Sequence, residues 1–255
     1  LFWHVVLSLA ITSIYGLGLA AAGAYQFDRL LWLNGASCLL LVTVGPRRLR
    51  LGRAAPRPGW SALVPTALIG LALAIFFFVP PSEYILGGRD PGVYMNEGIQ
   101  IAQRGTLIVE ESMVATVPAE FRDLFFPPYE RPGYYSGRFM GFFLLDPDAG
   151  TVVGQFPHLY PLWIAVGYGV NGLSGARCVG GLWAILGVVA VYFGGAWLVG
   201  RPAAAAAAFL LTVHVSQVWL SRYPNSEMLL QVLIFGALLA YSRATAGNRF
   251  FAPVA

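Results

Sequence analysis

The distribution of apolar residues divides the chain into long apolar runs and one polar segment between them. Runs of about 17 to 25 apolar residues are typical of helices that span a bilayer. Six runs approach that length, and the second and last of them are short: residues 1–24, 30–44, 61–79, 178–199, 203–220 and 228–241. The pattern therefore predicts an all-α fold, a polytopic bundle of transmembrane helices.

A polar segment, residues 80–157, separates the third and fourth runs. It holds ten of the twelve acidic residues of the chain. Turn signals such as Pro80-Pro81 and Asp146-Pro147 break it into short pieces. We expect juxtamembrane helices in this segment and no independent domain core, and we expect it to hold the active site.

The composition agrees with a membrane protein, because 57% of the 255 residues are hydrophobic and only 11% are charged. A soluble fold with this balance would lack polar groups for its surface. The net charge of +4 does not indicate a nucleic-acid partner, because the arginines do not cluster beside aromatic residues on a polar face. The positive-inside rule places the Arg-rich loop in the cytoplasm and the segment after residue 79 outside. That loop contains Arg47, Arg48, Arg50, Arg53 and Arg57.

Residues 157–173 form a further apolar stretch that is short and interrupted by three glycines. If this stretch spans the membrane, three arginines near later helix ends lie outside. If it lies along the outer interface, they lie in the cytoplasm, as the positive-inside rule favours: Arg201, Arg243 and Arg249. We prefer the interfacial interpretation, which puts residues 221–228 on the same side as Asp90.

The sharpest local motif is GGRDPGVYMNEGIQIAQRG, residues 87–105. Asp90 before Pro91 is typical of a helix start and Gly105 of a helix end, so the motif predicts a helix of about fourteen residues. Asp90 then lies at the positive end of that helix, where it either caps the helix or takes part in chemistry. Glu97 lies two turns along the same face and either contributes to the site or is simply solvated.

A second motif is SRYPNSEM, residues 221–228, a polar hinge between two apolar runs. Its two charges each have a structural alternative: Arg222 can snorkel, and Glu227 can favour a helix start. His158 and Tyr160 open the interfacial stretch, where they can meet a phosphate or a metal ion or be ordinary interfacial residues. The sequence has no Walker loop, zinc-protease motif, nucleophile elbow or spaced cysteine pair.

Three of these segments together resemble the multi-spanning GT-C glycosyltransferases. They are GRDPGVYMNEG, FPHLYPLWIA and SRYPNSEMLL, and the resemblance covers about residues 61–241. Within that superfamily the chain is most similar to the branch of protein mannosyltransferases and aminoarabinose transferases, glycosyltransferase family 39-like. The resemblance implies inverting transfer of a sugar from a polyprenyl-phosphate carrier to a glycan, lipid or protein acceptor on the outer face.

The resemblance also implies roles for individual residues. Asp90 matches the outer-loop acid that acts as general base, and Glu227 matches a second acid that positions the acceptor or helps hold a divalent cation. Such a cation, with Asp90 and Glu227 as ligands, is the one cofactor left open. The implied substrate-binding residues, some of which balance the charge of the departing phosphate, are Arg89, Tyr94, Glu97, His158, Tyr160 and Arg222.

The chain departs from that family in two motifs. Pro91 follows Asp90 where many members carry a second acid, and Phe156 precedes Pro157 where many carry Lys. We divide the chain into residues 1–60, two N-terminal helices with the Arg-rich loop, and residues 61–255, the catalytic module with an extracytoplasmic loop at 80–177. We expect this module to be incomplete, as in a fragment of a longer protein.

Two other function classes remain alternatives to a glycosyltransferase of the bacterial inner membrane with its site outside. A transporter or flippase for a lipid-linked or amphipathic solute predicts repeated halves, broken helices and ionisable residues near the bilayer midplane. A non-catalytic assembly subunit predicts that Asp90 only caps its helix. The concentration of charge in one loop and at helix ends favours chemistry at the membrane surface.

Overall fold

The computed structural model describes residues 2–44, 70–71, 73–83, 85, 90–127, 137–139 and 141–247. Within these ranges the chain is mostly α-helical. Arg89 and the Arg-rich loop of residues 47–57 lie outside the described residues, so the predictions made for them stay predictions.

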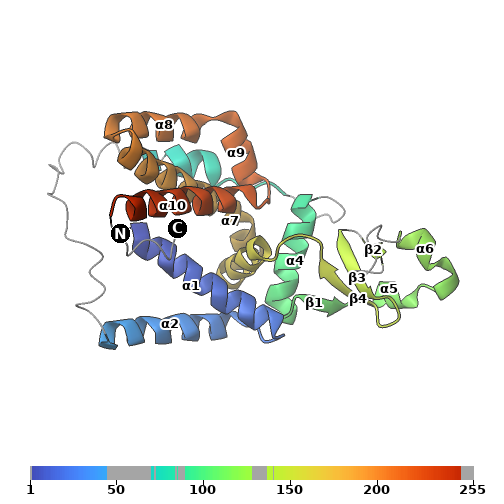
Figure 1. Cartoon of the computed structure of the whole chain (residues 1–255). Helices are drawn as coiled ribbons and strands as arrows, with labels where there is room; N and C mark the ends of the chain where they lie inside the picture. Colours follow the sequence, from blue (N-terminus) through green and yellow to red (C-terminus); the bar gives the residue numbers. More distant parts are fainter. Residues whose placement is uncertain are drawn as a thin grey trace.

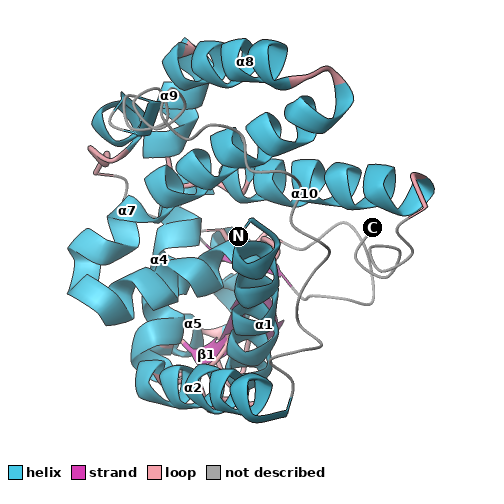
Figure 2. Cartoon of the chain, turned by 90° about the vertical axis from the view of Figure 1, so that its left-hand side faces the viewer, coloured by secondary structure: helices cyan, strands magenta, loops and turns pink. Residues whose placement is uncertain are grey.

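Most of the helices gather at one end of the molecule (Figure 1). They are α1 (Phe2–Ala21), α2 (Phe27–Val44), α7 (Leu159–Leu198), α8 (Arg201–Val213), α9 (Val215–Arg222) and α10 (Glu227–Thr245). Figure 2 shows α8 and α9 on one side of α10 and α1 and α2 on the other. Three of the described helices, α1, α7 and α10, are long and apolar enough to cross a membrane, with α8 and α9 as a fourth span if they are counted together. The fold is therefore consistent with an integral membrane protein.

Helix α7 is broken inside its 40 residues, at Asn171 and Gly172, whose backbone angles are not helical. Gly172 has a φ of +54°, a conformation that glycine adopts without steric cost. The part before the break, residues 159–170, is about 18 Å long, whereas the hydrocarbon core of a bilayer is about 30 Å thick. Only the part after the break, residues 173–198, is long enough to cross. This geometry favours the interfacial interpretation of residues 157–173.

The run of residues 203–220, predicted as a spanning helix, is bent in the structure. Helices α8 and α9 meet at a bend of 58°. His214 between them has φ −69° and ψ 127°, which ends α8, and its carbonyl then accepts the N–H of Val218 to begin α9. Hydrophobicity alone missed the bend, because the apolar run continues through it and only the backbone at His214 changes direction.

Helix α4 (Asp90–Arg104) confirms the helix predicted from the first motif. It ends at Gly105, whose φ of +75° is in the left-handed region. A side chain there would also meet the backbone, because a Cβ atom would lie 2.8 Å from the carbonyl oxygen of Tyr25. In Figure 1, α4 stands between the helices at one end and the strands at the other.

Beyond α4 the chain forms an antiparallel sheet of four strands in the order β1-β4-β3-β2. The strands are β1 (Ile108–Glu110), β2 (Gly137–Phe139), β3 (Phe142–Asp146) and β4 (Thr151–Gly154). Short helices, α5 (Ser112–Thr116), η1 (Ala119–Phe121) and α6 (Arg122–Phe125), follow β1. In the turn between β3 and β4, the Asp146 carboxylate accepts the N–H groups of Asp148 and Ala149 at 2.8 and 3.1 Å, as expected for a turn signal.

This sheet corrects two predictions. The fold is mostly α and not all-α, and the polar segment does contain a small core of its own: Val109, Val114, Phe126, Leu144 and Val152. The strands have only three to five residues. Alternation of apolar and polar positions is hard to recognise over so few residues, which explains why the sequence pattern did not predict them.

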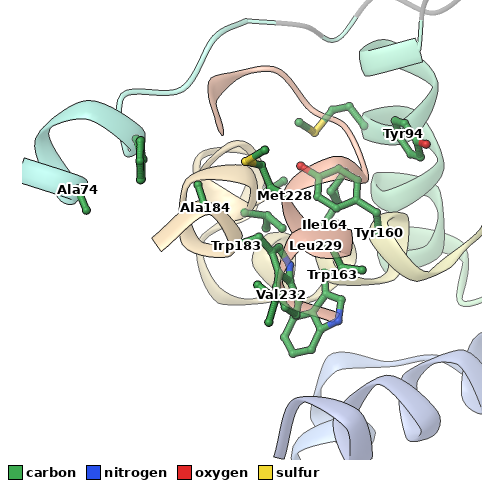
Figure 3. Close-up of a cluster of buried hydrophobic side chains, with 14 residues drawn as sticks. Ala74, Tyr94, Tyr160, Trp163, Ile164, Trp183, Ala184, Met228, Leu229 and Val232 are labelled. Atoms are coloured by element: carbon green, nitrogen blue, oxygen red, sulfur yellow. The ribbon is translucent and has the colours of Figure 1, made fainter. Parts of the chain in front are cut away.

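The largest core joins α4, both parts of α7, α10 and the helical residues 73–78 (Figure 3). Trp163 from the first part of α7 meets Trp183 from the second part edge to face, with ring centroids 5.1 Å apart. Gly98 of α4 lies against the first part of α7, where a Cβ atom would overlap the Ile164 side chain and lie 2.8 Å from the Pro161 carbonyl oxygen. The absence of a side chain at Gly98 is thus what allows α4 to approach α7 closely.

We expect Gly98→Ala to destabilise the protein by about 1–3 kcal/mol, because the added methyl group must separate α4 from α7. Gly236→Ala in α10 is the matched control, since among the described residues no atom outside its own helix lies within 4 Å of its added Cβ. This control should be neutral or slightly stabilising, because alanine is the better helix former. Thermal unfolding in detergent or nanodiscs measures both, and equal effects of the two substitutions would contradict the close packing.

Candidate functional site

The first residues of α4 and α10 lie around one shared region. The hydroxyl oxygens of Tyr94 and Ser226 are 3.1 Å apart although 132 residues separate them in the chain. Asp90 begins α4, Glu227 begins α10, and both side chains are exposed. The structure therefore places the two helix starts that carry the predicted catalytic acids next to each other.

Tyr94 lies within electrostatic reach of three acids. Burial is the main cause that raises the pKa of its phenol, and the carboxylates of Glu227, Asp90 and Glu97 raise it further. The ring of Tyr94 stacks on Phe156, with centroids 4.6 Å apart. Tyr94 was predicted to bind substrate, and its hydroxyl marks the point where α4 and α10 meet.

Tyr160 packs against the ring of Tyr94. The two rings meet edge to face, with centroids 5.4 Å apart, and Tyr160 is only 2% exposed (Figure 3). Its hydroxyl is hydrogen-bonded with the backbone of Asn225. The structure thus places Tyr160, predicted as a substrate-binding residue, inside the core, where it orients Tyr94 and the hinge.

Asn225 fixes the conformation of the hinge that leads into α10. Its side-chain amide donates to the carbonyl oxygens of Leu220 and Tyr223, at 2.9 and 2.6 Å. Its side-chain oxygen accepts the N–H of Glu227 at 3.1 Å. Asn225 is 4% exposed, so it positions Glu227 from inside the protein. The sequence offered one signal for this role, an Asn placed two residues before a helix start.

Glu97 and His158 form a pair that the sequence did not predict as a pair. The carboxylate of Glu97 is 0% exposed, and its Oε1 lies 2.5 Å from Nδ1 of His158. Gly154, at the end of β4, leaves the space for this carboxylate, since a Cβ atom there would overlap it. The alternative that Glu97 is simply solvated is wrong. The pair ties α4 to the start of α7.

The burial of this pair changes its titration. Burial raises the pKa of Glu97 above its usual value of 4.5. The hydrogen bond with Glu97 raises the pKa of His158 above 6.5. Both shifts favour a proton bound to the pair, and Glu97 Oε2 is buried without a hydrogen-bond partner in the described part of the chain. His158 is thus the group that compensates the buried carboxylate.

Arg222 contacts the backbone instead of the acids at the helix starts. Its Nε donates to the carbonyl oxygen of Phe77 at 2.8 Å, and its own carbonyl accepts the N–H of Ser82 at 3.3 Å. Arg177, which sequence reasoning missed, donates to the carbonyl oxygen of Ser82 and to the carboxylate of Glu83, both at 3.3 Å. The two arginines hold the segment that leads from residue 78 toward α4.

Asp90 and Glu227 supply the carboxylate oxygens that divalent cations prefer. Among the residues that the structure describes, no group of three or more His, Cys, Asp and Glu side chains is placed to hold a metal ion. A cation bound by Asp90 and Glu227 would take its other ligands from water or from the phosphate of a substrate, as Mg²⁺ commonly does.

No family model, curated protein or solved structure matches the chain. The chemistry must therefore be inferred from the arrangement itself. An exposed carboxylate at a helix start can accept a proton from a hydroxyl or an amine that approaches it. One such carboxylate, Glu227, begins an apolar helix, and the other, Asp90, begins the neighbouring α4 beside Tyr94 and Phe156. This arrangement suits a reaction on an amphipathic molecule at a membrane surface.

We expect the stability of the protein to fall as the pH rises, because both members of the Glu97–His158 pair have raised pKa values in the folded state. The contribution of Glu97 is lost as the pH rises from 4.5 through its folded pKa. The contribution of His158 is complete below pH 6.5 and is lost as the pH rises through its folded pKa. Glu97→Gln should weaken this pH dependence, since the uncharged amide no longer favours the imidazolium. Thermal midpoints measured across pH test this.

Glu110→Gln, on the exposed end of β1, is the matched control. Its pH profile should follow that of the wild type. A Glu97→Gln profile that also overlays the wild type would show that the pair does not contribute to the pH dependence.

Proposed function

We propose that this protein is a membrane glycosyltransferase that moves a sugar from a polyprenyl-phosphate carrier to a glycan, lipid or protein acceptor on the extracytoplasmic face. In this proposal Asp90 is the general base, Glu227 positions the acceptor or a divalent cation, and the anomeric carbon is inverted. The function combines the resemblance of three sequence motifs to GT-C glycosyltransferases with the arrangement of acids at two helix starts.

The observation that carries the proposal is the contact between Tyr94 and Ser226. This contact joins the motif that contains Asp90 to the motif that contains Glu227, although they are far apart in the chain. A structural cap at each helix would not require the two helix starts to be neighbours. A transfer between two substrates requires both substrates to be held at one reaction centre, and groups from two neighbouring helix starts can do this.

The position of these acids relative to the apolar helices supports a lipid-linked donor. Helix α10 is a candidate membrane span that begins at Glu227 itself. An acid at the end of a span lies near the level of the lipid headgroups. The phosphate of a polyprenyl carrier occupies that level, so its sugar can reach Asp90 while the polyprenyl chain stays in the bilayer.

The proposed transfer involves no change of oxidation state and needs no redox partner. The Asp90 carboxylate takes the proton of the acceptor hydroxyl or amine as the acceptor atom forms its bond to the anomeric carbon. The bond between that carbon and the phosphate oxygen breaks, and its electron pair leaves with the phosphate. The products are the glycosylated acceptor and the polyprenyl phosphate, which is a good leaving group and needs no general acid.

We expect Asp90→Asn to lower sugar transfer by about 100-fold or more, because a positioned general base contributes about that much to a rate. The assay supplies membranes containing the protein with a panel of radiolabelled polyprenyl-phosphate sugars and follows label in the acceptor. Asp123→Asn, at an exposed acid of α6, is the control and should transfer at the wild-type rate.

A folded Asp90→Asn variant that transfers at the wild-type rate would reduce Asp90 to a helix cap. The same assay with Glu227→Gln then tests whether the second acid is the base. If the wild type transfers no sugar from any donor of the panel, the transferase proposal fails for that set of donors.

Broken helices give the transporter alternative one specific support. Helix α7 breaks at Asn171 and Gly172, and α8 and α9 meet at 58°. Discontinuous helices are common at the substrate sites of transporters. Proteoliposomes distinguish the two functions: a transporter moves a labelled lipid-linked solute between leaflets without changing it, whereas a transferase changes the covalent structure of that solute.

A further inference from the structure

The imidazole of His158 is held in one orientation. Its Nδ1 faces Oε1 of Glu97 at 2.5 Å, and Glu97 is fully buried. The other side of the ring is not enclosed, since the His158 side chain is 31% exposed. Because Nδ1 is committed to Glu97, the second ring nitrogen, Nε2, is the one that can meet a ligand.

The chemistry of the pair fixes what Nε2 can do. The pair shares one proton between Nδ1 and Oε1. If the proton is on Nδ1, the imidazolium also carries a hydrogen on Nε2. If the proton is on Oε1, it is donated to Nδ1, and the neutral imidazole again carries its hydrogen on Nε2. In both arrangements Nε2 is a hydrogen-bond donor.

Loss of the shared proton reverses this property. A neutral ring with its hydrogen on Nδ1 donates to the Glu97 carboxylate and leaves a lone pair on Nε2. Burial of Glu97 and the hydrogen bond in the pair both raise the relevant pKa values, which keeps the proton bound. While the shared proton is bound, the ligand of Nε2 is therefore a hydrogen-bond acceptor and not a metal ion.

The charged groups around His158 support this assignment. Among the described residues, Glu97 is the titratable group that acts on His158.

His158 also stands at the start of α7, as its N-cap residue, and its side chain makes no capping hydrogen bond. The first N–H groups of a helix favour an anion. His158 thus immediately precedes the positive end of residues 159–170 in the chain. Glu97 lies seven residues after Asp90 in α4, a rise of about 10 Å, so the Glu97–His158 pair lies about two helical turns from the proposed base.

We propose that His158, oriented by Glu97, donates its Nε2 hydrogen to a phosphate group of the ligand. The identification of that phosphate as the one on the lipid carrier rests on the function proposed above. Glu97 is a positioning residue in this site, and Gly154 is the residue whose missing side chain admits its carboxylate.

The test uses ¹⁵N-histidine NMR of the purified protein in nanodiscs of zwitterionic lipid. The chain has only three histidines, so His4 and His214 serve as internal references for His158. The ring-nitrogen shifts report which nitrogen carries hydrogen. Two probes are added in separate arms, inorganic phosphate and undecaprenyl phosphate, so that a soluble anion and a lipid-borne one are distinguished.

We expect the wild type to show hydrogen on Nε2 at neutral pH and to show a change at that nitrogen, and not in His4 or His214, on addition of undecaprenyl phosphate. In Glu97→Gln the midpoint of the His158 titration should fall and the affinity for undecaprenyl phosphate should drop by about tenfold or more. Glu110→Gln should behave as the wild type. A response to inorganic phosphate alone would assign the site to a soluble anion and contradict the lipid-borne ligand.

Two results would overturn the proposal: an unprotonated Nε2 at neutral pH, or no response of His158 to either probe. An unchanged response in a folded Glu97→Gln protein would remove the role of Glu97. These outcomes do not depend on sugar transfer. A protein that responds at His158 but transfers no sugar would support the phosphate site and contradict the transferase proposal. A protein that transfers sugar without this response would support the transferase proposal and contradict the phosphate site.

Discussion

The close approach of α4 to the first part of α7 is the constraint on which the rest of the site depends. Gly98 permits it, since any side chain there would meet Ile164 and the backbone of Pro161. The approach buries one face of α4, and Glu97 lies on that face. A buried carboxylate without a partner lowers the stability of the fold, so a neighbouring segment must supply a partner. His158 is that partner. The same approach sets Tyr94 against Tyr160 and therefore against the hinge before α10.

Sequence reasoning succeeded where the signal was local. The bounds of α4 follow from Asp90, Pro91 and Gly105, which act within one turn of the helix ends. The hinge of residues 221–228 lies beside the start of α4, where Tyr94 contacts Ser226, which is compatible with the expectation that the hinge and Asp90 lie on the same side of the membrane. That expectation came from charge placement, which constrains the side of the membrane on which each loop lies.

Sequence reasoning failed where the deciding contact is distant or the element is short. The pairing of Glu97 with His158 joins positions 61 residues apart, and nothing near either residue indicates the other. The sheet was missed because its strands are too short to show alternation. The position of Tyr160 within the core could not be distinguished from an interfacial one, since an aromatic residue suits both. The contact between Arg222 and the backbone at Phe77 could not be predicted from the sequence either.

The contact between Tyr94 and Ser226 has a consequence for the synthesis of the protein. The sheet of residues 108–154 closes through contacts within its own segment, so it can form soon after it is made. The neighbouring helix starts cannot meet until 132 further residues have been added after Tyr94, which takes about 7 to 26 s at typical rates of translation. For that period the growing chain carries Asp90 without Glu227, and the two helix starts can meet only afterwards.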